Sequence, residues 1–189
     1  INYHIKKPDL SMQDVINTVN MGLDSPFYQN IDVIVNPYEL TVLVNKYNQL
    51  PAGFEQAGLV EVERAYRSND GKQYLLTGNT YENYKIMSDA AKADGVSMYI
   101  VSAYRTESYQ RGLYNGRVTS TGKVNADNYT ARPGHSEHQT GLAVDIGSTK
   151  GSFEYTPEFK WLQAHAHEYG FILRYPKGKE WITGYSYEP

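Results

Sequence analysis

Two residues of metal-binding type lie seven positions apart in the stretch Ser136–Asp145. His138 provides an imidazole and Asp145 a carboxylate, and small residues separate them. Imidazole and carboxylate are both good ligands for a borderline metal such as zinc. A polar loop histidine and a strand-end aspartate would show the same spacing, so the pair alone makes a metal site a hypothesis.

Residues 142–146 alternate between branched apolar side chains and small or acidic ones, which is typical of a β-strand. On such a strand Asp145 shares its face with Gly141 and Ala143, two of the smallest residues available. These small neighbours leave room beside the backbone for an ion, its waters and a substrate. A strand built only for packing would carry larger side chains on both faces.

A hydrolytic zinc site usually has three protein ligands and leaves a fourth position for water. It also needs a carboxylate that takes a proton from this water and passes it to the leaving amine. Glu188 is the candidate for this general base, because it ends a tyrosine-rich segment predicted to be a strand. A solvated carboxylate near a chain end is the alternative interpretation.

Arg105 lies at the entry to a predicted helix. If Thr106 is the N-cap, Arg105 immediately precedes it and Gln110 occupies the fourth helical position, so the two side chains are neighbours. The planar guanidinium suits a carboxylate or a developing oxyanion, and the helix N-terminus adds positive potential. The alternative is a surface cation near a helix end.

The remaining histidines are weaker candidates. His135 is close to His138 in the sequence and is interpreted as a loop histidine. His165 and His167 lie two residues apart on a predicted helix, so they point in different directions and suit no shared site.

The composition excludes several kinds of site and partner. The chain has 189 residues and no cysteine, so a metal site must use histidine, carboxylate and water ligands. The net charge of −3 gives no electrostatic case for nucleic acid or an anionic membrane. No apolar run reaches about 18 residues, so no membrane span is expected. Because the chain starts at Ile1, we expect a processed product with an export signal or anchor upstream.

Capping residues and apolar periodicity predict several helices. The clearest are expected at about 81–94 with Asn79 as N-cap, after Thr106, and at about 157–169 with Thr156 as N-cap. A short helix capped by Ser11 belongs to a predicted lead-in segment at 1–35, with Val15, Ile16 and Val19 as its apolar face.

Strands and loops complete the predicted domain. Alternating and β-branched segments predict strands at 96–103, 142–146, 171–175 and 181–187, whereas 117–133 is predicted to be a long polar loop. Short strands and helices are interleaved without a regular βαβ rhythm. This favours a single α+β domain at 36–189.

Two motifs resemble a known family. Residues 102–105 have the form Ser-x-Tyr-Arg, with Gln110 five residues after the arginine, and 136–145 have the form Ser-x-His-x-x-Gly-x-Ala-x-Asp. Together with the lead-in at 44–48 and the tail at 169–189, they resemble the zinc D-alanyl-D-alanine carboxypeptidases of the VanY and LdcB kind. The resemblance covers most of the chain.

The resemblance implies roles for individual residues. His138 and Asp145 would be zinc ligands and Glu188 the general base. The residues implied in substrate binding are Arg105, Tyr104, Gln110 and Ser136. The family's tail usually continues from Glu-Pro into Trp and His, which implies a third ligand two residues after Pro189. The implied fold is a central antiparallel sheet flanked by helices, as in the Hedgehog and D,D-peptidase fold.

The implied function is zinc-dependent removal of the C-terminal D-alanine from peptidoglycan stem peptides. The resemblance favours a D,D-bond over an L,D-bond, and the sequence leaves both open. The expected location is the bacterial cell envelope, outside the cytoplasm. The alternative is a peptidoglycan-binding module that keeps the cleft without the catalysis. For the zinc site we expect loss of the metal as the pH falls below about 6, because His138 must be neutral and Asp145 ionised to bind it.

Overall fold

The computed structural model describes residues 4–5, 7–20, 24–148 and 150–189, and its helices and strands are short. In chain order they are α2 (Met12–Asn20), β1 (Asp32–Val33), β2 (Asn48–Gln49), β3 (Leu59–Glu61), the 3-10 helix η1 (Arg64–Tyr66), β4 (Leu75–Thr77), α3 (Gly78–Ala93), β5 (Ile100–Ser102), α4 (Glu107–Thr121), α5 (Lys123–Tyr129), the 3-10 helix η2 (Glu137–Thr140), β6 (Asp145–Ile146), the 3-10 helix η3 (Gly151–Tyr155), α6 (Pro157–His165), the 3-10 helix η4 (Ala166–Tyr169) and α7 (Glu180–Thr183).

The strands confirm an α+β fold but form three pairs rather than one wide sheet. Among the described residues, β3–β4 and β5–β6 are antiparallel, and β1–β2 is parallel. The β5–β6 pair matters most for the site, because its register places Ser102 opposite Asp145. The strands predicted at 96–103 and 142–146 are therefore present but shorter, since an irregularity between Ile100 and Ser102 interrupts the ladder.

The main core lies between α3, β4, β5 and α6. Tyr84, Met87 and Ala91 form the buried stripe of α3 and pack against residues such as Ile100 and Leu162. Each large apolar side chain buried in this way stabilises the fold by about 1.5–3 kcal/mol. This core fixes β5, whose far end leads into the candidate site.

The N-cap of helix α3 lies two residues before the predicted one. Thr77, not Asn79, caps the helix, and its side chain accepts a hydrogen bond from the Thr80 backbone N–H at 3.4 Å. Both residue types are good caps, and the end of strand β4 at Thr77 decides between them. The predicted C-terminal stop is confirmed, since Gly95 has a φ of +83°.

The polar loop predicted at 117–133 is wrong. Helix α4 continues to Thr121, and α5 follows after Gly122, which has a φ of +82°. These helices bury few side chains, chiefly Gln110, Tyr114 and Ala126, so their sequence lacks a continuous apolar stripe. They pack instead on each other, and no single-helix pattern could show this.

The C-terminal segment also differs from the prediction. Helix α6 begins at Pro157, and Thr156 is its N-cap as predicted. It continues into η4, which ends at Tyr169 and is followed by the predicted stop Gly170. The strands predicted at 171–175 and 181–187 are wrong, because only an isolated bridge joins Tyr175 to Glu188 and α7 replaces the start of the second strand. Gly178 and Gly184 have φ values of +79° and +72°, so the backbone turns there instead of extending.

The lead-in packs on the domain through its second half. The Asp32 backbone N–H donates to the Tyr47 carbonyl at 2.8 Å within the β1–β2 pair. Ser11 caps α2 as predicted, but the buried residues are Val15 and Thr18 rather than Ile16 and Val19. The boundary at 35/36 stays a prediction.

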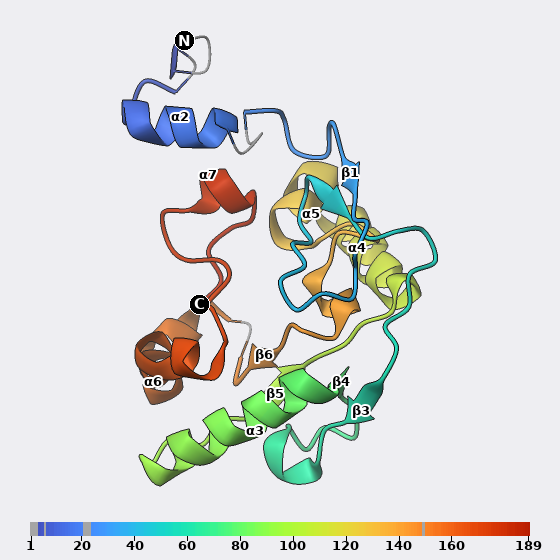
Figure 1. Ribbon diagram of the computed structural model, residues 1–189, viewed down its shortest axis with the longest axis vertical. Coiled ribbons are helices and arrows are strands. Elements are labelled where there is room, and N and C mark those ends of the chain that lie inside the picture. Colours follow the sequence, from blue (N-terminus) through green and yellow to red (C-terminus); the bar gives the residue numbers. More distant parts are fainter. Residues whose placement is uncertain (1–3, 6, 21–23, 149) are drawn as a thin grey trace.

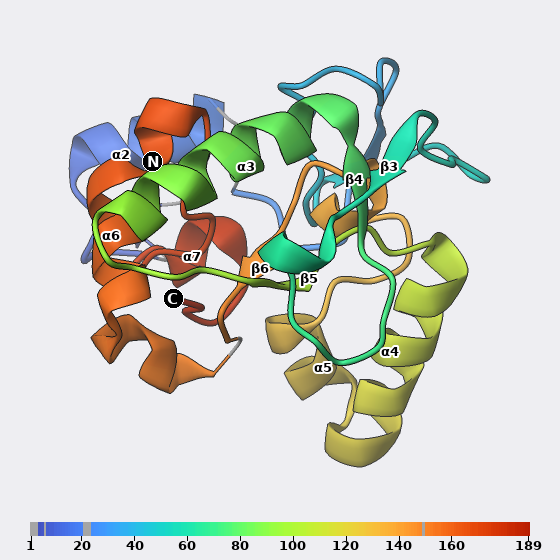
Figure 2. The ribbon, with the colours of Figure 1, turned by 90° about the horizontal axis from the view of Figure 1, so that it is seen from below.

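Figures 1 and 2 show how the elements surround β5 and β6. The α4–α5 pair lies on one side of the molecule, and α6 and α7 lie on the other, with β5 and β6 between them in both views. The C-terminus lies near β6 on the α6 side. In the described part of the chain, no helix has the length and apolar character needed to cross a bilayer.

Candidate metal centre

His138 and Asp145 meet beside the end of β5. The His138 Nε2 atom lies 3.4 Å from Asp145 Oδ1, and both side chains are largely buried. The other ring nitrogen, Nδ1, donates a hydrogen bond to the Ala103 carbonyl oxygen at 2.7 Å. Since a carbonyl can only accept, this bond places a proton on Nδ1, so Nε2 is the ring nitrogen that can bind a metal ion.

This geometry fits a shared metal ion. Zinc holds nitrogen and oxygen ligands at about 2.0–2.1 Å, so tetrahedral coordination separates two ligand atoms by about 3.3–3.4 Å. The observed Nε2 to Oδ1 distance of 3.4 Å agrees with that edge. Within the described ranges, no cluster of three or more His, Cys, Asp or Glu side chains suits a metal ion. His138 and Asp145 are therefore a pair of candidate ligands in the described part of the chain.

Arg105 binds the other oxygen of Asp145. Its Nη2 atom donates to Asp145 Oδ2 at 2.9 Å and to Ser102 Oγ at 2.7 Å, and its Nε donates to the same Oγ at 3.1 Å. The Arg105 backbone N–H also donates to the His138 carbonyl oxygen at 3.1 Å. The two oxygens of the carboxylate thus have different partners: Oδ1 faces His138 and Oδ2 accepts from Arg105.

The charges around Asp145 keep it ionised. Burial acts to raise the pKa of its carboxyl group, but His138 and Arg105 outweigh that effect and hold the pKa below its ordinary value. Ionised carboxylate is the form that binds a metal.

Glu188 reaches the same site from the C-terminal tail. Its backbone N–H donates to the Tyr175 carbonyl at 3.3 Å, which brings the tail alongside residue 175. The residue as a whole is exposed, yet the protein atoms around its carboxyl group raise its pKa, and the negative charge of Asp145 adds to the rise. His138 and Arg105 act to lower the same pKa. The Glu188 carboxyl group therefore interacts electrostatically with His138, Asp145 and Arg105.

The other predicted substrate-binding residues differ in position. Gln110 is buried, and its Nε2 donates to the Ala131 carbonyl at 2.8 Å, while Oε1 has no hydrogen-bond partner among the described residues. Ser136 is buried just before η2. Tyr104 is half-buried and lines a hollow of about 300 Å³ with Thr106 and Arg111. This hollow therefore adjoins the chain on both sides of Arg105.

His135, His165 and His167 take no part in the site. His135 is buried, with Nδ1 2.7 Å from the Asn45 carbonyl oxygen and its ring edge-on to Tyr28. His165 contacts Glu168 at 3.2 Å on the surface, and His167 is exposed. These positions agree with the structural roles expected for them.

Sequence reasoning missed residues that orient the site. Ser102 holds the Arg105 guanidinium, and it was already visible as the first residue of the Ser-x-Tyr-Arg motif. The Ala103 backbone carbonyl orients His138, and no side-chain pattern could reveal it. Arg174 donates from Nε to Glu137 Oε1 at 2.7 Å, which ties η2 to the segment before Tyr175.

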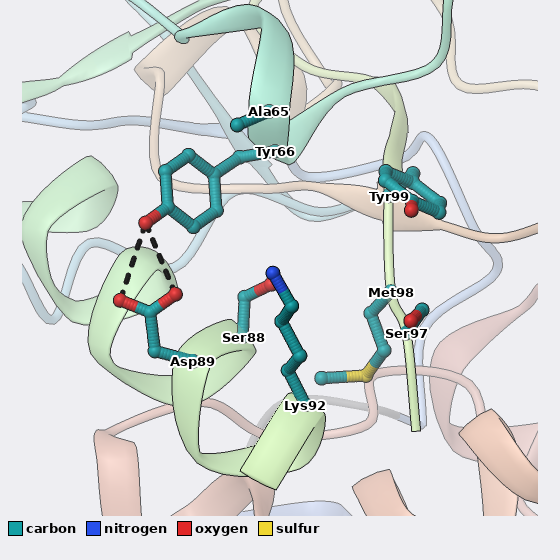
Figure 3. A pocket seen from close by; sticks show the side chains of 8 residues that line it. All are labelled: Ala65, Tyr66, Ser88, Asp89, Lys92, Ser97, Met98 and Tyr99. Atoms are coloured by element: carbon teal, nitrogen blue, oxygen red, sulfur yellow. Dashed lines mark hydrogen bonds between the residues drawn. The ribbon is translucent and has the colours of Figure 1, made fainter. Parts of the chain in front are cut away.

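A second hollow lies away from these residues. Figure 3 shows it between η1, α3 and residues 97–99, with a volume of about 80 Å³. The Tyr66 hydroxyl donates to the Asp89 carboxylate across its edge, and Lys92 points into the same space. It contains none of the predicted site residues.

Sequence comparisons match this chain to one family and to several of its members. The VanY family model, described as D-alanyl-D-alanine carboxypeptidase, matches residues 72–189. YodJ of Bacillus subtilis (strain 168) is 39% identical, over 92% of this chain and 69% of YodJ. A D-alanyl-D-alanine carboxypeptidase of Enterococcus faecalis (strain ATCC 700802 / V583) is 34% identical, over 78% of this chain and 55% of that protein.

Solved structures show the same likeness. The LdcB LD-carboxypeptidase superposes with a TM-score of 0.79 at 38% identity, covering 85% of this chain and 78% of that chain. A vancomycin-resistance D,D-pentapeptidase VanY variant in complex with Zn(II) superposes with a TM-score of 0.65 at 33% identity, covering 80% and 85%. The chain therefore has the α+β fold of LdcB- and VanY-type peptidases. It belongs to the VanY family of D-alanyl-D-alanine carboxypeptidases.

Proposed function

We propose that this chain is a zinc-dependent carboxypeptidase that removes the C-terminal D-alanine from peptidoglycan stem peptides. The observation that carries the proposal is the 3.4 Å separation of His138 Nε2 and Asp145 Oδ1, with Arg105 and Glu188 beside them. The family match and the Zn(II) complex of a VanY relative support it. The substrate and the zinc dependence are carried over from these relatives.

His138 and Asp145 would hold the zinc ion. Bound zinc supplies Lewis acidity, which polarises a peptide carbonyl and makes water a stronger nucleophile at neutral pH. Neighbouring groups of the protein orient these two ligands. The Ala103 carbonyl fixes the His138 ring, and Arg105 fixes the Asp145 carboxylate.

Glu188 moves the proton. Its carboxylate accepts a proton from the attacking water and delivers it to the nitrogen of the leaving D-alanine. The raised pKa of Glu188 suits this exchange, because a group must both take and release the proton near the working pH.

Arg105 binds negative charge on the substrate. Its Nη1 atom has no hydrogen-bond partner in the described part of the chain, whereas Nε and Nη2 are held by Ser102 and Asp145. A guanidinium fixed on one side and open on the other can donate to a terminal carboxylate or to the oxyanion of the transition state.

The relatives point to two different scissile bonds. The sequence favoured a D,D-bond, as in the D,D-pentapeptidase relative. The higher TM-score and identity with LdcB, an LD-carboxypeptidase, favour the L,D-bond that precedes a single terminal D-alanine. A stem pentapeptide ending in D-alanyl-D-alanine and a tetrapeptide ending in one D-alanine separate the two. Either activity would place the protein at the cell envelope.

The test measures D-alanine release from both peptides by the zinc-loaded full-length protein. We expect release from at least one of them, and Glu188→Gln should lower kcat by about 10²–10⁴-fold while zinc content stays unchanged. Glu82→Gln, an exposed glutamate on α3, is the matched control and should retain full activity.

Two results would contradict the proposal. Unchanged kcat in Glu188→Gln would remove the general base. Binding of both peptides without release of D-alanine, by protein that holds zinc, would favour the alternative of a peptidoglycan-binding module.

A further inference from the structure

A buried lysine lies at the base of the C-terminal tail. Lys46 is 2% exposed. Its Nζ donates to the Asp127 carbonyl of α5 at 2.6 Å and to the Gly184 carbonyl that follows α7. Burial lowers the pKa of Lys46 to about 8, which leaves the ammonium group protonated at neutral pH.

Three aromatic rings surround the same ammonium group. The Nζ atom lies 4.2 Å from the ring centroid of Tyr185, 4.9 Å from that of Phe27 and 5.4 Å from that of Tyr28. We call these rings and the two carbonyls the Lys46 cage. Carbonyl oxygens and ring faces both favour a cation, so the cage compensates the ammonium for its lost hydration.

The cage joins parts of the chain that are far apart in the sequence. Phe27 and Tyr28 come from the lead-in, Asp127 from α5, and Gly184 and Tyr185 from the tail. The hydroxyl groups of Tyr28 and Tyr185 are 3.3 Å apart. Figure 1 shows the tail running from α7 to the C-terminus near β6. The cage therefore holds the segment that carries Glu188.

Gly184 shows how closely the tail approaches the cage. Its φ is +72°, and a Cβ atom there would lie 2.7 Å from Phe27 Cζ and 2.9 Å from Lys46 Cδ. Neither distance is compatible with a normal contact, so a larger residue at 184 would push the tail away. Only glycine allows both this backbone conformation and this approach.

We propose that Lys46 is a positioning residue for Glu188: the buried ammonium holds Gly184 and Tyr185, and thereby sets the place of the carboxylate four residues after Gly184. This inference rests on the proposed function. Lys46 contacts neither His138 nor Asp145 in the described structure, so its loss should affect proton transfer and leave the metal ligands intact.

The first variant is Lys46→Met, which keeps the length of the aliphatic stem and removes the charge. We expect kcat for D-alanine release to fall about 10–100-fold, because a misplacement of about 1 Å costs roughly 10²-fold in rate. The KM and the bound zinc should stay within twofold. Amide hydrogen exchange at 185–188 should become faster, while exchange in α3 stays unchanged.

Lys177→Met is the matched control. Lys177 is exposed and lies over the Tyr187 ring of the same tail at 5.5 Å, so it tests loss of an ordinary surface cation. Its kcat and its tail exchange should match the wild type.

Gly184→Ala is the second variant, since it displaces the tail without removing a buried charge. It should lower kcat to a similar extent with zinc retained. Wild-type kcat in either folded variant would overturn the proposal. Global unfolding of both would also overturn it, because the cage would then support the whole fold rather than the tail.

The two levels of the proposal can fail separately. If the wild-type protein releases no D-alanine, the proposed function fails, and the exchange measurement still reports whether Lys46 holds the tail. If the wild type is active and Lys46→Met keeps its kcat, only the role of Lys46 fails.

Discussion

At the scale of residues, the candidate site depends on how one carboxylate is shared. Asp145 directs Oδ1 to His138 and Oδ2 to Arg105, so the proposed metal ligand His138 and the proposed substrate-binding cation Arg105 contact the same side chain. Ser102 holds Arg105 from the other side. A substitution of any one of these residues therefore alters the positions of the others. The effects of combined substitutions on the rate should not be additive.

As long as zinc stays bound, the pH dependence of the rate should follow the ionisation of Glu188. A general base works in its ionised form, and the pKa of Glu188 is raised, so activity should be lost on acidification at a pH above glutamate's ordinary value of 4.5. We expect kcat, measured with saturating peptide and excess zinc, to fall with a midpoint above 4.5. Bound zinc is measured at each pH as the control. A kcat that stays constant below 4.5 would contradict Glu188 as the base.

At the scale of elements, helix caps place the site residues. The Thr106 side chain accepts a hydrogen bond from the Tyr109 N–H at 3.1 Å and starts α4 directly after Arg105. In the same turn, the Arg105 backbone N–H donates a hydrogen bond to the His138 carbonyl oxygen. The N-cap thus fixes the turn between β5 and α4, and this turn positions the Arg105 side chain.

Loss of this cap should lower the stability of the protein measurably. Thr106→Ala leaves an N-terminal N–H of α4 without its partner, and we expect the free energy of unfolding to fall by about 1 kcal/mol. Urea denaturation should show a lower midpoint with an unchanged m-value. Thr106→Ser keeps the hydroxyl group and should behave like the wild type. Equal losses in both variants would mean that the cap bond is not the cause.

At the scale of the whole molecule, metal binding should be coupled to folding. His138 and Asp145 come from η2 and β6, and they meet only when β5 and β6 pair. A ligand that binds only the folded state stabilises it by about 2.7 kcal/mol at a hundredfold excess over its Kd. Zinc should therefore raise the thermal unfolding temperature of the full-length protein, and a chelator should reverse the rise.

The control for this effect is a histidine outside the site. His138→Ala should abolish the zinc-dependent rise, whereas His167→Ala, at an exposed position on η4, should keep it. The same rise in both variants would show that zinc binds elsewhere.

Local chemistry determined much of this protein from the sequence alone. Thr106 and Thr156 cap helices where they were expected to, and Gly95 and Gly170 end them. These features need only a few neighbouring residues, because caps and stops satisfy backbone groups within one turn. The metal-ligand residue types and the family motifs could be recognised for the same reason.

Only the tertiary structure decided the rest. The polar segment at 117–133 became two helices because α4 and α5 pack on each other, and the tail turned at Gly178 and Gly184 instead of forming strands. Asp145 contacts both His138 and Arg105, and Lys46 donates a hydrogen bond to Gly184. These contacts join residues up to 138 positions apart. Such contacts depend on where the folded chain brings distant segments together, and no local pattern encodes that placement.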